Sequence, residues 1–444
     1  MQLLPQLAEV EKHFPEELVI VGVHSPKFPA ERDSRSLRSA VQRNEVEHPV
    51  VNDADMTIWS SYAVRAWPTL MFLDPQGRVI GKHEGEAPAD ALIDTIAGLI
   101  GRYDPEGLIN RTPISGLRPM PRPDTPLAFP GKILADGASG RLFIADTGHN
   151  RIVVTKLDGS DPWVIGTGEI GLVDGGIDEA RFHNPEGLAL DGDTLYVADK
   201  NNHAIRRVDL SARSVTTIAG TGALGMSYAE AGPAHSVDLR SPWDLTLHGT
   251  TLYIAMAGMH QIWALDPAAG MLFPYAGTGR EEIRDYDLER ARLAQPSGLD
   301  NDGRKLYFVD SETSSVRKAD LPPFDEVRTI VGTGLFDFGD KDGVGDEVLL
   351  QHPLGLALGD GVLYVADSYN DKIKRVYPSE RRVESWLGDG TPGQADGTGS
   401  AARFHQPSGL AVASGKLFIA DTNNHAIRVA DLATGDVSTL MIQL

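Results

Sequence analysis

One pattern of apolar and polar positions recurs six times along the chain. A run that begins with leucine and an aromatic or apolar residue ends in Ala-Asp or a variant of it, and a polar turn and a second apolar run follow. The copies are "LFIADTGHNRIVV" from Leu142, "LYVADKNNHAIRRV" from Leu195, "LYIAMAGMHQIWAL" from Leu252, "LYFVDSETSSVRKA" from Leu306, "LYVADSYNDKIKRV" from Leu363 and "LFIADTNNHAIRVA" from Leu417. They lie 53 to 57 residues apart, and a near-constant period of this length is typical of a repeat architecture.

Each repeat contains four short stretches of strand length that are separated by turn residues. The first follows a Pro-x-Gly start, as in "PEGLAL" and "PSGLAV", and the second is the recurring run itself. The third begins about six residues beyond the shared acidic position, and the fourth is short, as in "VTTIAG". Four antiparallel strands repeated six times predict a six-bladed β-propeller over residues 129–444.

The first hundred residues follow a different pattern, in which helix-like and strand-like stretches alternate. The expected elements are a helix over 1–14, a buried strand over 18–24, a helix that Ser34 caps and that runs to about Asn44, a helix over 53–64, a hairpin over 69–85 that turns at Asp74–Gly77, and a helix over 87–103. These elements indicate an α/β domain over 1–104. Six prolines then mark a semi-rigid linker over 105–128.

Composition narrows the classes of function. The 444 residues carry a formal net charge of −21, which argues against binding to nucleic acid or to anionic lipid. The chain contains no cysteine, so it has neither a disulfide nor a thiol nucleophile. No apolar stretch reaches the length of a membrane span, and the start lacks the basic region of a signal peptide. We therefore expect a cytoplasmic protein that binds neither nucleic acid nor membrane.

The α/β pattern resembles the thioredoxin fold, and "AWPTLMFLD" resembles its cis-proline loop, with Pro68 as the cis-proline. The repeats resemble NHL repeats. Taken together, "GVHSPKFPAE", "HPVVNDAD", "WPTL", "FPGK", "IAMAGMHQIWAL" and "LYVADSYNDKIK" make the chain similar to the NHL-repeat-containing protein 2 family. That resemblance implies a thioredoxin-like domain followed by a six-bladed NHL propeller. Two features of the family are absent here, namely the Cys-x-x-C motif and a C-terminal β-rich domain.

The resemblance places the Cys-x-x-C motif and a central strand upstream of residue 1. In the thioredoxin fold, that strand lies between the counterparts of "LVIVGVH" and "TLMFLD". Without it, these two strands would expose apolar edges or pair directly with each other. Two explanations stay open. The thioredoxin-like domain is truncated because Met1 is not the native start, or the domain is degenerate and its strand pairing has rearranged.

The recurring aspartates are the first candidate site residues. They are Asp146, Asp199, Asp310, Asp367 and Asp421. Each ends a strand before a polar turn, where its carboxylate can accept backbone N–H bonds, and metal ligation is the alternative. The turn residues His203, His260 and His425 fall on different repeats, so the sequence does not place them in one zinc site. We expect neither a metal nor a cofactor.

Met256 takes the place of the recurring aspartate in the third repeat. It lies close in sequence to His260 and Trp263, and two interpretations apply. The turn has an altered packing, or these residues form a patch on the rim of the propeller that binds a partner.

Loops of about twenty residues connect successive repeats and are expected on the face that carries the turns after the second strands. Arg181, Arg292 and Arg403 each stand four residues before a proline in these loops. They can line the mouth of the central channel, or they can hydrogen-bond carbonyl groups between blades.

These observations favour a non-catalytic scaffold whose loop-rich propeller face binds a protein or peptide. The candidate binding residues are Trp67, Pro68, Arg181, Met256, His260, Trp263, Arg292 and Arg403, and no catalytic residue is assigned. The alternative is a thiol–disulfide oxidoreductase whose Cys-x-x-C lies upstream of Met1 in a longer chain, with Trp67 and Pro68 shaping the substrate groove.

Overall fold

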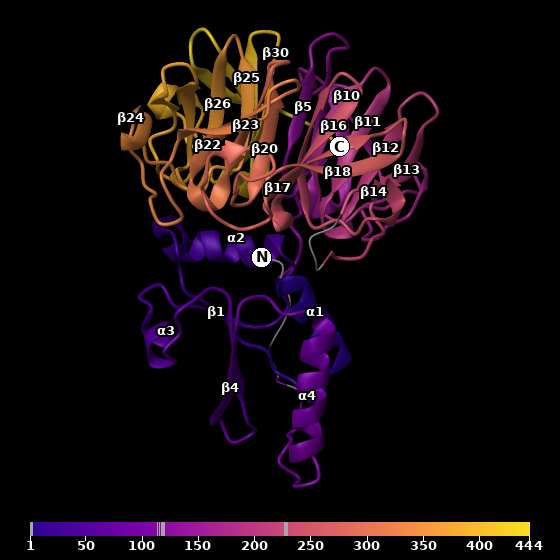
Figure 1. Ribbon diagram of the computed structural model, residues 1–444, viewed down its shortest axis with the longest axis vertical. Coiled ribbons are helices and arrows are strands. Elements are labelled where there is room, and N and C mark those ends of the chain that lie inside the picture. The colour runs from indigo at the N-terminus through magenta and orange to yellow at the C-terminus, as the bar shows by residue number, and fades with distance from the viewer. Residues whose placement is uncertain (1–2, 113, 115, 117–119, 226–229) are drawn as a thin grey trace. The chain divides into compact units, whose positions relative to one another are not determined.

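The computed structural model describes residues 3–112, 114, 116, 120–225 and 230–444. The chain divides into two compact units, Met1–Arg122 and Pro123–Leu444 (Figure 1). The first is a small α/β unit and the second is a six-bladed β-propeller, which confirms the predicted fold class at this level. No helix within these residues is both long and apolar enough to span a bilayer.

Each blade is an antiparallel sheet whose strands follow one another in sequence, from the inner strand to the outer strand. Blade 1 holds β5 (Ile133–Asp136), β6 (Arg141–Asp146), β7 (Arg151–Lys156) and β8 (Trp163–Ile165); blade 2 holds β10 (Pro185–Asp191), β11 (Thr194–Asp199), β12 (Ala204–Asp209) and β13 (Ser214–Ala219); blade 3 holds β15 (Pro242–His248), β16 (Thr251–Met256), β17 (Gln261–Asp266) and β18 (Met271–Ala276).

The remaining three blades repeat this order. Blade 4 holds β20 (Pro296–Asn301), β21 (Lys305–Asp310), β22 (Ser315–Asp320) and β23 (Glu326–Val331); blade 5 holds β25 (Gly355–Gly359), β26 (Val362–Asp367), β27 (Lys372–Tyr377) and β28 (Arg382–Leu387); blade 6 holds β30 (Pro407–Ala413), β31 (Lys416–Asp421), β32 (Ala426–Asp431) and β33 (Asp436–Thr439). Contacts between neighbouring inner strands run in the cyclic order β5, β10, β15, β20, β25, β30 and back to β5.

A fifth strand of two residues completes five of the six blades. These strands are β9 (Gly175–Gly176), β14 (Gly232–Pro233), β19 (Tyr286–Asp287), β24 (Gly343–Val344) and β29 (Gly397–Thr398), and each pairs with the outer strand of its blade. The prediction of four strands per blade was therefore incomplete. Two residues inside a long loop are too short to show a strand periodicity, so the sequence did not reveal them.

The hydrophobic core lies between adjacent blades. Phe143 of blade 1 and Leu188 of blade 2 belong to one buried cluster, and Ile144 of blade 1 and Phe418 of blade 6 belong to another. The second cluster shows that the ring closes by the same packing that joins the other blades. Each side chain in these clusters loses its water contact, and burial of a large apolar side chain contributes about 1.5–3 kcal/mol.

Hydrogen bonds add to this closure. The Ser408 hydroxyl donates to the Gly131 carbonyl over 2.9 Å, and the Thr422 hydroxyl donates to the Pro130 carbonyl over 2.8 Å. Among the described residues, no strand of blade 1 or blade 6 comes from the opposite end of the chain. The ring thus closes without a borrowed strand, a point that the sequence left open.

The first unit has four α-helices, four strands and one short 3-10 helix in its described part. They are α1 (Leu3–His13), β1 (Gly22–His24), η1 (Pro29–Arg32), α2 (Ser34–Arg43), β2 (Val50–Asn52), α3 (Thr57–Ser61), β3 (Thr69–Leu73), β4 (Val79–Glu84) and α4 (Ala89–Tyr103). β1 pairs with β2 in parallel, and β3 pairs with β4 antiparallel around the predicted turn at Asp74–Gly77. The two pairs form separate sheets.

The predicted strand over 18–24 was too long and was wrong about burial. Only Gly22–His24 forms a ladder, and the side chains of Val19 and Val21 are 57% and 52% exposed. Leu18 and Ile20 pack against the cluster that α1 and α4 form, so alternate residues do face a core. The ladder ends early because β2 is three residues long and none of the described strands pairs with the other edge of this segment.

Two helix boundaries also differ from the prediction. Asp33, rather than Ser34, precedes α2 and accepts a hydrogen bond from the backbone N–H of Arg35. The helix expected over 53–64 is shortened to α3, because the Asp53 carboxylate accepts the N–H groups of Ile58 and Trp59 and holds residues 53–56 as a turn.

Candidate functional site

The long loops between blades and the turns between second and third strands meet on one side of the propeller. Asn202, Asn370 and Asn424 of these turns each donate a side-chain hydrogen bond, over 2.7 Å, to a carbonyl group of the loop beside them. We call this surface the loop face. It comprises residues 166–184, 220–225, 230–241, 277–295, 332–352 and 388–406, together with the six turns.

Four buried cations hold the loops in place. The guanidinium of Arg206 donates to the Asp199 carboxylate over 2.8 Å and to the carbonyl groups of Arg181 and Val173, both over 2.8 Å. It also pairs with Asp174 of the loop over 2.9 Å. Arg317, Lys374 and Arg428 occupy the same position in blades 4, 5 and 6, and all four side chains are fully buried.

Sequence reasoning missed these four cations. Each stands seven residues after a recurring aspartate, so the repeat alignment contained the signal. Arg or Lys at an inward strand position is rarely buried without a partner, and the aspartate is that partner. The arrangement ties a strand end, a loop backbone and a loop carboxylate together, and so preorganises the loop face.

The recurring aspartates serve the blades themselves. Asp199 accepts the backbone N–H of His183 over 2.8 Å, and the equivalent bonds recur at Asp146, Asp310, Asp367 and Asp421. In the described part of the chain, no three His, Asp or Glu side chains are placed to hold a metal ion. These contacts support the structural interpretation of the aspartates.

Blade 3 replaces the buried ion pair with two apolar side chains. Met256 stands in register with Asp199, and Trp263 stands in register with Arg206. Both are fully buried in one hydrophobic cluster, and the Trp263 indole donates to Gln261 over 3.1 Å. Exchange of a buried ion pair for apolar residues of similar volume is often neutral or stabilising.

The burial of Met256 and Trp263 differs from the expected rim patch. Their side chains belong to the core between blades 2 and 3 and offer no surface to a partner. The altered packing, which was the other interpretation, describes them.

His260 belongs to a set of six residues that join neighbouring blades. Each has a left-handed backbone conformation after the turn, and its side chain accepts a backbone N–H from the next blade. The pairs are Asn150 with Asn184, His203 with Ser241, His260 with Gln295, Ser314 with His352, Asp371 with Gln406, and His425 with Phe129. Burial lowers the pKa of His203, His260 and His425 to about 4, so all three are neutral acceptors at pH 7.

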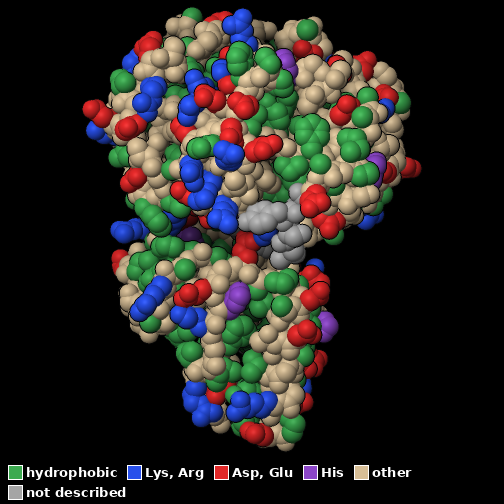
Figure 2. Space-filling model, in the orientation of Figure 1, with side chains coloured by type: hydrophobic (Ala, Val, Ile, Leu, Met, Phe, Trp, Pro, Cys, Tyr) green, Lys and Arg blue, Asp and Glu red, His purple; other side chains and the backbone are tan. Residues whose placement is uncertain are grey.

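Arg181, Arg292 and Arg403 lie on three different loops and do not converge. Arg181 pairs with Glu169 over 2.6 Å, Arg292 pairs with Glu282, and Arg403 pairs with Asp389 over 3.2 Å. Their side chains are between 26% and 46% exposed, and none lines the channel cavity. Figure 2 shows basic and acidic side chains interspersed over the visible side of the propeller, in keeping with such surface pairs. A binding role for the three arginines stays a prediction.

Trp67 is exposed and Pro68 is half-buried in the first unit. The peptide bond between them is cis, as predicted. The Trp67 ring lies against the Trp59 ring with 4.4 Å between centroids, and its indole N–H donates to the Ser25 carbonyl over 2.9 Å. The Trp67 side chain is nevertheless 45% exposed, so it remains available for contact. Its binding role stays a prediction.

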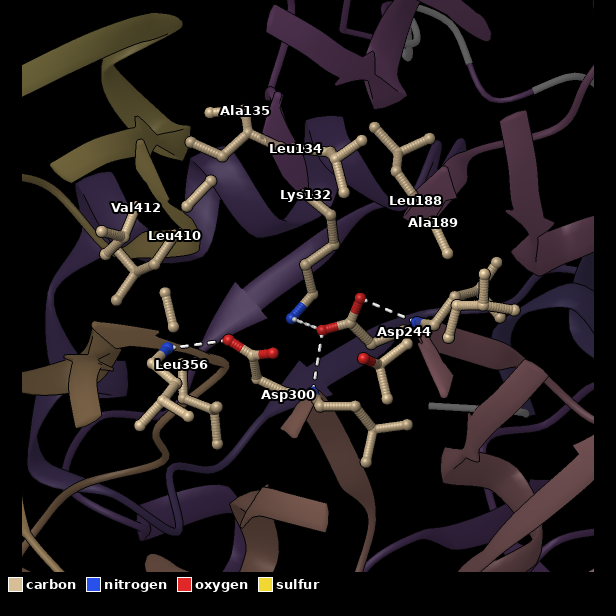
Figure 3. Close-up of a pocket in the computed structure, with 18 of the residues that line it drawn as sticks. Lys132, Leu134, Ala135, Leu188, Ala189, Asp244, Asp300, Leu356, Leu410 and Val412 are labelled. Carbon is tan, nitrogen blue, oxygen red and sulfur yellow. Dashed lines mark hydrogen bonds and ion pairs between the residues drawn. The ribbon is translucent and has the colours of Figure 1, made fainter. Parts of the chain in front are cut away.

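The six inner strands enclose a cavity of about 300 Å³ along the axis of the propeller (Figure 3). Near the loop face, four blades place a glycine where their inner strands approach one another. A Cβ atom at Gly355 would lie 1.9 Å from the Ser408 carbonyl oxygen, so no larger residue fits there. The backbones therefore narrow the channel at this level.

Blades 1 and 3 carry charged residues at the level of these glycines. The Lys132 ammonium lies 3.2 Å from the Asp244 carboxylate (Figure 3). It also donates to the carbonyl groups of Ser297 and Leu354, both over 2.6 Å. Asp244 accepts the backbone N–H of Leu299 over 3.0 Å. This pair closes the cavity toward the loop face and ties blades 1, 3, 4 and 5 together.

Comparisons with known proteins show which proteins the chain resembles. The NHL repeat family matches residues 182–207 and 404–430. The chain is 40% identical over 479 residues to NHL repeat-containing protein 2 of Gallus gallus, covering 100% of this chain and 66% of that protein. It is 41% identical over 462 residues to Protein SUPPRESSOR OF QUENCHING 1, chloroplastic, of Arabidopsis thaliana, covering 99% of this chain and 44% of that protein. The chain thus spans 66% and 44% of the length of these relatives.

Among solved structures, an auxiliary nutrient binding protein from Bacteroides thetaiotaomicron matches with a TM-score of 0.53 and 14% identity, over 71% of this chain and 70% of that one. At this identity the likeness shows the propeller fold alone. The relatives show more, because their identity extends over the whole chain. The chain belongs to the family of NHL repeat-containing protein 2.

Proposed function

We propose that this chain is a non-catalytic interaction scaffold whose loop face binds a protein or peptide. The observation that carries the proposal is the set of buried cations that clamp the long loops. A surface whose loops are already ordered loses less conformational entropy on binding than a flexible one. Rigid strands below ordered loops are a common basis for recognition sites.

The first long loop offers a defined contact area. Ile170, Leu172 and Val173 lie close together in sequence, and their side chains are 43%, 38% and 41% exposed. Exposed apolar groups beside charged ones suit a protein partner, since their burial supplies affinity and the charged rim supplies specificity. Binding to nucleic acid or to membrane is not part of the proposal.

The test compares two exposed apolar residues on opposite ends of the propeller. Ile170→Asp alters the loop face, and Phe324→Asp is the matched control, because Phe324 is 67% exposed on a turn between third and fourth strands. Affinity capture with the full chain, followed by cross-linking mass spectrometry, identifies the partner and its contact site. We expect Ile170→Asp to lose the partner and Phe324→Asp to retain it. Equal capture by both variants would refute the loop face as the binding surface.

The thioredoxin-like character of the first unit and a cytoplasmic location stay predictions. The chain has no cysteine, so it carries no thiol for disulfide exchange. The oxidoreductase alternative concerns residues outside this sequence, and no contact described above favours it.

A further inference from the structure

Charged residues that depart from the six-fold repeat gather in the central channel. The position two residues after the glycine level lies on the inner strand of every blade. Blade 4 carries Asp300 there. The other five blades carry leucine, alanine or threonine, namely Leu134, Ala189, Thr246, Ala357 and Ala411. A residue that every blade needs would recur in every blade. Asp300 is therefore specific to this one place in the channel.

Asp300 is a half-buried carboxylate on the channel wall, and no ion pair to it is found among the described residues. Its two oxygens accept the backbone N–H groups of Leu358 and Asn301, both over 2.7 Å. Within the residues that the structure describes, no Lys, Arg or His forms an ion pair with it, whereas Asp244 has Lys132. Loss of contact with water and the nearby carboxylates of Asp244 and Asp302 raise the pKa of Asp300 to about 6.

A carboxylate that has lost much of its contact with water is unfavourable as an anion unless a positive charge approaches it. The cavity gives such a charge a place, because Asp300 lies on its wall together with Leu190, Leu356 and Leu410 (Figure 3). A volume of about 300 Å³ accommodates a small organic molecule. The carbonyl groups along the edges of inner strands supply further acceptors for a donor such as an ammonium group.

We propose that the channel cavity binds a small molecule that carries a protonated primary amine. Asp300 holds the ammonium group as an ion pair, and the leucine side chains contact the apolar part of the ligand. The pair of Lys132 and Asp244 closes the cavity toward the loop face, so the ligand enters from the opposite end of the channel. The site therefore goes beyond the proposed protein-binding function and does not depend on it.

The experiment uses n-butylammonium chloride and its neutral isostere n-butanol as probes. Saturation-transfer NMR titrations of both probes against the full chain at pH 7.5 give their dissociation constants. We expect n-butylammonium to bind at least tenfold more tightly than n-butanol. We also expect affinity for n-butylammonium to fall about tenfold between pH 7.5 and pH 5, because a carboxyl group with a pKa near 6 is largely protonated at pH 5.

Asp300→Asn removes the charge and retains an oxygen acceptor for a backbone N–H. Asp191→Asn is the matched control, since Asp191 lies at the end of the inner strand β10, is exposed, and does not line the cavity. We expect Asp300→Asn to weaken n-butylammonium binding at least tenfold and Asp191→Asn to change it less than twofold. Absence of saturable binding to the wild type, equal affinity for the two probes, or unchanged binding by a folded Asp300→Asn variant would each overturn the proposal. The comparison of probes on the wild type remains decisive if Asp300→Asn does not fold.

Discussion

Lys132 and Asp244 meet at the centre of the propeller, with 3.2 Å between the ammonium nitrogen and a carboxylate oxygen, although they come from the first and third blades. The lysine side chain crosses the channel and also binds carbonyl groups of blades 4 and 5. One side chain therefore links four blades that otherwise touch only their immediate neighbours. Because the pair is almost completely buried, it has little solvent screening.

Replacement of Lys132 by methionine leaves Asp244 buried without its cation. We expect the free energy of unfolding to fall by about 3–5 kcal/mol, because removal of one partner leaves an uncompensated buried charge. Urea denaturation followed by tryptophan fluorescence measures the change. The control is Lys156→Met, since Lys156 pairs with Asp161 at the surface and is 61% exposed. Its expected effect is within about 1 kcal/mol, and equal effects of the two variants would contradict the role of the channel pair.

Blade 2 is expected to tolerate replacement of its buried ion pair by the apolar residues that blade 3 has at the same positions. Arg206→Trp alone leaves Asp199 buried without its ion-pair partner and is expected to destabilise the protein by about 3–5 kcal/mol. The triple variant Asp199→Met, Ala204→Gln, Arg206→Trp reproduces the residues of blade 3 and removes the stranded charge. We expect it to be more stable than Arg206→Trp in thermal unfolding. A triple variant that is less stable than the single one would show that the two blades are not interchangeable at these positions.

The pH dependence of stability is expected to carry the signature of His203, His260 and His425. Their pKa values are lowered to about 4 in the folded state, against an ordinary value of 6.5, so the unfolded chain binds more protons between these two values. Their contribution is complete above pH 6.5 and is lost as the pH falls toward 4. In His425→Asn the new side chain can still accept the Phe129 N–H but has no group that titrates. Asn150 is the equivalent residue of blade 1, where it accepts the Asn184 N–H.

Unfolding free energies at a series of pH values between 4 and 7 test this expectation. The slope of stability against pH should be smaller in His425→Asn than in the wild type, by up to the equivalent of one proton. His235→Ala is the control, because His235 is exposed, and its slope should match that of the wild type. If the slope of His425→Asn also matches the wild type, His425 does not titrate as a buried neutral acceptor.

Trp67 is expected to stabilise the first unit through one hydrogen bond and one ring contact. Two substitutions measure these two contributions separately. Trp67→Phe keeps a ring against Trp59 and loses the bond to the Ser25 carbonyl, with an expected loss of about 0.5–1.5 kcal/mol. Trp67→Ala loses both contacts and should destabilise the unit further. Hydrogen exchange of β1 and β3, measured by mass spectrometry, reports on this unit without reference to the propeller. Equal exchange in the two variants would show that the ring contact contributes nothing.

The repeated strands and turns could be predicted because their signals are local. A period near 55 residues, a Pro-x-Gly start and an alternating apolar pattern are each visible within one repeat. The hairpin of β3 and β4 was also predictable from a short stretch, and the cis bond before Pro68 was expected from the resemblance of this stretch to the cis-proline loop of the thioredoxin fold. The strand over 18–24 was predicted too long, since its extent depends on a partner strand rather than on its own residues.

The interpretation of the third repeat needed more than the alignment. Met256 stood out because it breaks the aspartate pattern, but the sequence did not show that Trp263 replaces the partner cation at the same time. Arg206 and its equivalents were overlooked for the same reason. The two members of each pair lie on different strands, and their contact is visible only when the strands are paired.

The sequence by itself determined the number of blades, the order of their four main strands and the succession of an α/β unit and a propeller, because these follow from residues close together in the chain. Only the tertiary structure decided which charges are buried together, how the ring closes, and that Asp300 faces the channel cavity. The physical reason is that burial and electrostatic pairing depend on what other blades place beside a residue. Lys132, Asp244 and Asp300 are far apart in sequence, and they line one cavity only because six repeats close into a ring.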